Sequence, residues 1–104
     1  MCIRDRVYYV RVIKVVVLTT QAKKDLRKVP VRIAMKFRMW VTSVELEGLQ
    51  NIRKIPGYHD EPLRGKRKGQ RSIRLSKQYR AFYIVNKNDT VEFVSVEEIN
   101  KHDY

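Results

Sequence analysis

The pattern of apolar and polar positions divides the chain into an N-terminal strand, a pair of helices and a series of strands. Val12–Leu18 is rich in valine and isoleucine, which predicts a buried strand. Apolar residues then recur at spacings of three and four through Gln21–Lys28 and Val31–Glu47, which predicts a helical hairpin. Gly48 follows the last periodic residue and is expected to end the second helix.

Within the second helix, large apolar side chains could form either a binding face or part of the core. Met35, Met39 and Trp40 occupy helical spacings there. Such residues more often belong to a core, so we predict that all three are buried.

From residue 70 onward the hydrophobic period changes to two. Alternation over about 70–76, then over Tyr79–Val85 and Thr90–Val96, predicts three strands joined by short turns. They are expected to form an antiparallel meander, with Val12–Leu18 at one edge of the same curved sheet. The predicted fold class is therefore α+β, in a single domain over residues 1–104.

The composition limits the kinds of metal or disulfide site that the chain can form and indicates its cellular compartment. The single cysteine excludes a disulfide framework and any multi-cysteine metal site, and we expect no metal and no cofactor. The longest apolar run, Val7–Leu18, contains two cations and is too short to span a bilayer, so no membrane association and a cytoplasmic location are expected. The opening MCIRDR differs in composition from the rest of the chain, and residues 1–10 are interpreted as a non-native or extended start.

The formal net charge is +12, and one stretch of the C-terminal half carries positive charges alone. Between Pro62 and Asn88 there is no acidic residue, which predicts a concave positive surface rather than a mixed, solvated one. Tyr79, Phe82 and Tyr83 lie in the same region, and aromatic side chains beside a basic groove are typical of single-stranded RNA binding. The expected RNA-contact residues are Arg64, Lys66, Arg67, Lys68, Arg71, Arg74 and Lys77.

Two strings carry a resemblance to a known family. GYHDEPLRGKRKGQRSIRLSKQYRAFYIV (residues 57–85) and VEFVSVEEINKHDY (residues 91–104) closely resemble the RelE/ParE/HigB superfamily of toxins from bacterial type II toxin–antitoxin modules. The likeness extends over about Val12 to Tyr104, and the order of predicted elements agrees with it.

The resemblance implies a toxin that enters the ribosomal A site and cleaves mRNA there. It also implies a cognate antitoxin that neutralises the toxin in a hetero-oligomer. Because RNA carries its own nucleophile, the 2′-OH, such an endoribonuclease needs proton transfer and charge stabilisation but no metal.

Four residues match the catalytic positions of the family. Arg80 matches its phosphate-binding arginine, and Glu61 matches a position that holds a general base, although an ion pair with Arg64 or Lys66 is an equal alternative. His102 and Tyr104 match the C-terminal general acid and base-stacking tyrosine.

The C-terminal match departs from several relatives, because Asp103 separates the histidine from the tyrosine. A shift of one residue on a strand would turn His102 to the opposite face, so a solvent-exposed terminal histidine is an equal alternative. His59 is a third choice for acid–base chemistry.

Two other functions compete with mRNA cleavage. ParE-like members share the fold but inhibit DNA gyrase, and a decayed site would leave a non-catalytic RNA-binding protein. The set Glu61, Arg80 and His102 favours the endoribonuclease.

Overall fold

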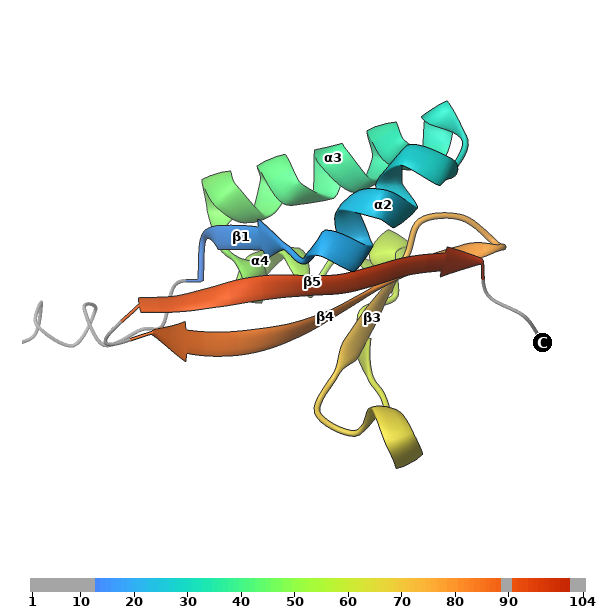
Figure 1. Ribbon diagram of the computed structural model, residues 1–104. Coiled ribbons are helices and arrows are strands. Elements are labelled where there is room, and N and C mark those ends of the chain that lie inside the picture. The colour runs from blue at the N-terminus through green and yellow to red at the C-terminus, as the bar shows by residue number, and fades with distance from the viewer. Residues whose placement is uncertain (1–12, 89–90, 102–104) are drawn as a thin grey trace, which may run out of the picture.

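The computed structural model describes residues 13–88 and 91–101. A five-stranded mixed sheet carries helices on one face and a looped excursion on the other (Figure 1). This architecture confirms the predicted α+β fold with an N-terminal strand, helices and antiparallel strands in one sheet.

The sheet has the strand order β1-β5-β4-β3-β2. Its centre is a long antiparallel hairpin, β4 (Tyr79–Asn88) and β5 (Val91–Lys101), and β3 (Arg71–Arg74) continues the antiparallel pairing on β4. On the far edge β1 (Val15–Leu18) runs parallel to β5. The two-residue strand β2 (Glu61–Pro62) completes the other edge and was not expected from the sequence, because two residues show no periodicity.

Three helices cover one face of this sheet. They are α2 (Thr20–Lys28), α3 (Val31–Glu47) and the single turn α4 (Leu49–Ile52). The predicted hairpin agrees with α2 and α3 to within one residue. Gly48 ends α3 with a φ of 89°, a left-handed conformation that residues with a Cβ adopt only at a cost.

The core lies between α3 and the sheet. The inward face of α3 buries Ile33, Phe37, Trp40 and Val44, and the Trp40 ring packs at 5.5 Å from the ring of Tyr83 on β4. Ile73, Ala81, Val96 and Ile99 bring the sheet into the same cluster.

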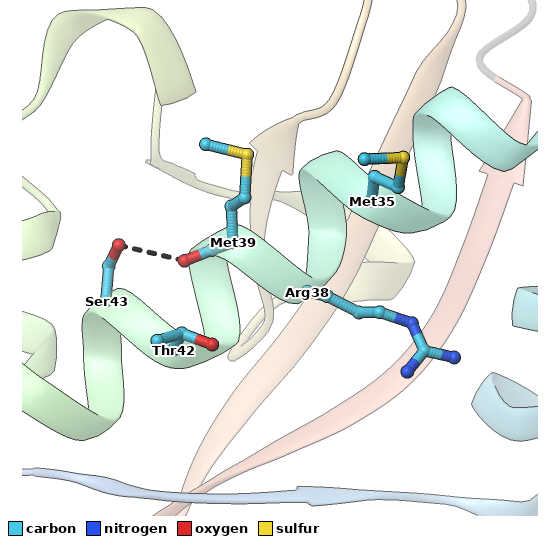
Figure 2. A pocket seen from close by; sticks show the side chains of 5 residues that line it. All are labelled: Met35, Arg38, Met39, Thr42 and Ser43. Atoms are coloured by element: carbon cyan, nitrogen blue, oxygen red, sulfur yellow. Dashed lines mark hydrogen bonds between the residues drawn. The ribbon is translucent and has the colours of Figure 1, made fainter.

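The prediction that both methionines of α3 are buried is wrong, whereas that for Trp40 is confirmed. Met35 and Met39 are each 60% exposed and lie on the face of α3 that points away from the sheet, where Figure 2 shows them beside Arg38 and Ser43. Periodicity alone could not separate them from the core, since the buried stripe of α3 is flanked by further apolar residues.

The N-terminal strand also differs from its prediction. Val15 and Val17 are each 46% exposed, because β1 is an edge strand with only one covered face. Among the described helices, none has the length and apolar character needed to cross a bilayer.

Candidate functional site

The alternation of side chains on β4 gives the sheet two chemically different faces. Arg80 and Phe82 point to the face without helices, and Tyr83, after a bulge between residues 82 and 83, points to the helices. Because directly paired residues share a face, Ser72 and Arg74 of β3 also lie on the helix-free face, opposite Phe82 and Arg80. We call this helix-free side of β3 and β4 the open face.

Arg80 lies at the centre of the open face and is only 6% exposed. Its Nη1 donates a hydrogen bond of 2.8 Å to the hydroxyl of Ser72, and its Nη2 lies 3.4 Å from Oε1 of Glu61. A buried guanidinium needs such partners because desolvation of an unpaired charge is costly. Two of the predicted catalytic residues, Arg80 and Glu61, thus lie in contact.

Glu61 bridges Arg80 to a histidine. Its second oxygen, Oε2, lies 3.4 Å from Nε2 of His59, whose side chain is 56% exposed. The ion pairs that the sequence offered as an alternative, with Arg64 or Lys66, are not those that the structure contains: among the described residues Glu61 pairs with Arg80 and His59.

Asp60 lies between His59 and Glu61 in the chain, but its side chain is held on the face of the sheet opposite to the open face. Its carboxylate is 1% exposed, accepts a 2.5 Å hydrogen bond from the Tyr83 hydroxyl and pairs at 2.6 Å with Nε of Arg71. Burial, and then the negative charge of Asp60, raise the pKa of Tyr83 well above its ordinary value. This buried network fixes the segment that carries His59 and Glu61.

A short 3-10 turn, η2 (Gly65–Arg67), folds back under the open face. The guanidinium of Arg67 stacks 4.3 Å from the centre of the Phe82 ring and pairs with Glu98 of β5 at 3.0 Å. Figure 1 shows this excursion projecting from the sheet on the side away from the helices. It forms one flank of the open face.

The predicted RNA-contact residues divide into two groups. Five of them are exposed and free to meet a polyanion: Arg64, Lys66, Lys68, Arg74 and Lys77. Arg67 is half-buried in its contacts with Phe82 and Glu98, whereas Arg71 lies opposite buried Tyr83 and is engaged by Asp60. Arg71 thus contributes to the buried network, and its contact with RNA stays a prediction.

The open face is also less uniformly positive than the sequence suggested. Glu61 and Glu98 come from outside the acid-free stretch and pair with Arg80 and Arg67. Strand pairing places these two carboxylates on the open face, and a count of charges along the sequence could not predict this placement.

The aromatic residues expected to stack on bases are mostly engaged elsewhere. Tyr83 is fully buried, Phe82 is 8% exposed beneath Arg67, and Tyr79 packs partly against the core. His102 and Tyr104 lie outside the described residues. Asn100, paired with Arg80, brings the end of β5 alongside the site.

Sequence reasoning did not find the supporting residues Ser72 and Asp60. Ser72 shows no relation to Arg80 in the sequence, because the two residues come together only when β3 pairs with β4. Asp60 lies in a loop, where an aspartate is usually solvated. Within residues 13–88 and 91–101 no group of three or more histidine, cysteine, aspartate or glutamate side chains is placed to hold a metal ion.

The fold is that of a class of small toxins from type II toxin–antitoxin modules. Residues 16–98 match the family model described as "ParE toxin of type II toxin-antitoxin system, parDE". The chain therefore belongs to the ParE toxin family, within the RelE/ParE superfamily of type II toxin–antitoxin toxins. The resemblance inferred from the sequence is thereby confirmed. None of the curated proteins compared with the chain matches it.

Solved structures show the same fold at low sequence identity. A YoeB/ParE toxin from Agrobacterium tumefaciens is 20% identical with a TM-score of 0.61, over 86% of this chain and 99% of that one. YafQ from E. coli is 19% identical with a TM-score of 0.65, over 84% and 91%. A chain of the RelBE2 toxin–antitoxin complex of Mycobacterium tuberculosis is 26% identical with a TM-score of 0.58, over 88% and 100%.

Proposed function

We propose that this toxin is an endoribonuclease that cleaves mRNA in the ribosomal A site and so inhibits translation. The observation that carries the proposal is the buried Arg80, held on the open face by Ser72 and Glu61. A guanidinium in a poorly solvated setting binds a phosphate strongly and stays charged throughout a reaction.

The pairing of Arg80 with Arg74 supports an anionic ligand. These two cations lie directly opposite each other on adjacent strands, an arrangement that is destabilising in an empty sheet. A phosphate bound between them would relieve the repulsion and would gain charge as the phosphorane forms. The exposed lysines and arginines around them would hold the flanking phosphates of the strand.

The chemistry needs no group beyond the RNA and the protein. The 2′-oxygen attacks the adjacent phosphorus, the bond to the 5′-oxygen breaks, and a 2′,3′-cyclic phosphate and a 5′-hydroxyl result. Arg80 would stabilise the added negative charge. Glu61 is the base that the family resemblance implies, with His102 as the acid and Tyr104 as the stacking residue.

The partner proposed for this toxin is its cognate antitoxin, a protein that would neutralise it in a hetero-oligomer. The M. tuberculosis relative was crystallised in such a toxin–antitoxin complex. Because the substrate is ribosome-bound mRNA, the site of action would be the cytoplasm.

The test is toe-printing of a translated mRNA with wild-type toxin and two variants. Arg80→Ala should lose cleavage, whereas Arg32→Ala, which removes an exposed arginine from α3, should cleave normally. If Arg80→Ala still cleaves at the wild-type rate, the site is misplaced.

A second candidate is inhibition of DNA gyrase, because the matching family model is described as a ParE toxin. A supercoiling assay on purified gyrase separates the two activities. Inhibition of supercoiling without any mRNA cleavage would favour this candidate, and neither activity would indicate a non-catalytic RNA-binding protein.

A further inference from the structure

His59 is presented at the edge of the open face in an unusual backbone conformation. Its φ of 47° places it in the left-handed region, and among the described non-glycine residues it alone has a positive φ. Such residues cost free energy, and they persist where the surroundings hold them. Here both neighbours are anchored: Tyr58 is 7% exposed in the core and the Asp60 carboxylate is bound by Tyr83 and Arg71.

The imidazole of His59 is partly exposed to solvent and lies beside Glu61. Its Nε2 lies 3.4 Å from Oε2 of Glu61, and Oε1 of the same carboxylate lies 3.4 Å from Arg80. The three side chains thus form a line from solvent to the buried guanidinium. With hydrogen on Nε2 facing the carboxylate, the Nδ1 lone pair is left free to accept a proton.

Glu61 is poorly placed to accept that proton itself. Its oxygen Oε2 already faces His59, and its oxygen Oε1 faces Arg80. Protonation of the carboxylate would weaken its charge pairing with the Arg80 guanidinium. Histidine changes its charge between about pH 5 and 8 and is the commonest general base in proteins. A carboxylate that orients an imidazole is a recurrent arrangement.

We propose that His59, oriented by Glu61, is the base that takes the 2′-OH proton. This assignment rests on the proposed function and deepens it: His59 takes the role of base that the family resemblance implies for Glu61, and Glu61 becomes a positioning residue. Nδ1 of His59 takes the proton while the 2′-oxygen forms its bond to phosphorus. The 5′-oxygen leaves with the electron pair of the broken P–O bond and takes a proton from His102, the acid that the family resemblance implies. The imidazolium of His59 then returns its proton to the solvent, and His102 regains one from it.

His59 meets the charged groups of the site through Glu61. Glu61 of β2 faces it, Arg80 of β4 lies behind Glu61, and the adjacent Asp60 turns its carboxylate to Arg71 and Tyr83. The buried Asp60 network is thus a positioning device for the His59–Glu61 pair.

The test uses His59→Gly, because glycine adopts this conformation without the Cβ penalty. The variant should keep a Tm at or above that of the wild type, yet cleave ribosome-bound mRNA about 10²–10⁴-fold more slowly. Imidazole added to the assay should restore a large part of the loss, since the half-exposed site is open to solvent. Arg80→Ala serves as the control that imidazole does not rescue.

A pH–rate profile supplies a readout that a merely structural role would not change. The wild-type rate should rise with pH through the range in which histidine loses its proton. The rise should vanish in His59→Gly and persist at a lower rate in Glu61→Gln. If wild type shows no cleavage at all, the proposed function and this assignment both fail.

Three outcomes overturn only the assignment to His59: cleavage by His59→Gly at the wild-type rate, a loss that imidazole does not relieve, or a rising limb that disappears in Glu61→Gln instead. The last of these would make Glu61 the base.

Discussion

Removing the hydroxyl of Tyr83 tests the buried network that holds the functional loop. In Tyr83→Phe the aromatic ring still packs on Trp40, but Asp60 loses its 2.5 Å hydrogen bond. Only the interaction with Arg71, at 2.6 Å, then remains on that carboxylate. The substitution therefore removes this hydrogen bond to a buried charge, together with the interactions of the hydroxyl with Arg53 and Arg71.

The size of the effect depends on the burial of both partners. Tyr83 is fully buried and the Asp60 carboxylate is 1% exposed, so water cannot replace the lost donor. Hydrogen bonds to charged groups contribute about 1.5–3 kcal/mol to the free energy of unfolding. For a domain of this size, 1 kcal/mol corresponds to roughly 4–8 °C in Tm.

Urea unfolding at neutral pH measures this free energy directly. Tyr79→Phe is the matched control: it makes the same chemical change in a tyrosine of β4 whose hydroxyl donates no hydrogen bond to another described residue. Equal urea midpoints for Tyr83→Phe and the wild type would refute the reasoning.

The same variant should behave differently in alkali. Because burial and the charge of Asp60 raise the pKa of Tyr83, the folded protein keeps this phenol neutral at a pH where the unfolded chain ionises it. Its contribution to stability is complete below about pH 10 and is lost as the pH rises further. The stability difference between wild type and Tyr83→Phe should therefore shrink above about pH 10, and a constant difference would contradict the shift.

Three further outcomes are expected. Gly48→Ala should lower the free energy of unfolding by about 1–2 kcal/mol, because its φ of 89° is unfavourable for alanine, and a urea titration will show whether the midpoint falls. Met35→Lys should change stability by less than about 0.5 kcal/mol, whereas Trp40→Ala should cost about 3–5 kcal/mol; a large loss in the methionine variant would mean that this face is covered. RNA affinity should fall with log[salt] at a slope of roughly −0.7 per phosphate neutralised, and a flat response would show that the basic open face is not the contact surface.

The elements of this fold were predictable because their signals are local. The helical spacing through α2 and α3, the glycine after α3 and the change to a period of two all act within a few residues of the chain. The parallel placement of β1 on β5 and the strand β2 depend on pairings between distant segments. Apolar periodicity also failed to distinguish Met35 and Met39 from the core, since exposure depends on what packs on α3.

The candidate site was predictable only in part for the same reason. Arg80 and Glu61 were each predicted as catalytic candidates, and the structure places Nη2 of Arg80 3.4 Å from Oε1 of Glu61. Their partners Ser72 and His59 are defined by strand register and by a left-handed loop residue, neither of which a linear motif shows. The run of cations in the sequence suggested one continuous positive surface, but contacts between strands place the carboxylates of Glu61 and Glu98 on it.

The adjacent residues Asp60 and Glu61 have different roles, because one stabilises the fold and the other contacts the proposed catalytic arginine. Consecutive residues of an extended chain point to opposite faces, so Asp60 enters the buried network with Tyr83 while Glu61 reaches Arg80 on the open face. Asp60→Asn should therefore destabilise the fold, on the order of 3 kcal/mol, because it removes the charge that faces Arg71. Glu61→Gln should lower the urea midpoint less than Asp60→Asn, since its carboxylate is 44% exposed although it faces the buried Arg80, and should slow cleavage of ribosome-bound mRNA. If both variants lost stability and activity in the same proportion, the two carboxylates would share one role, and the separation of the two faces would be wrong.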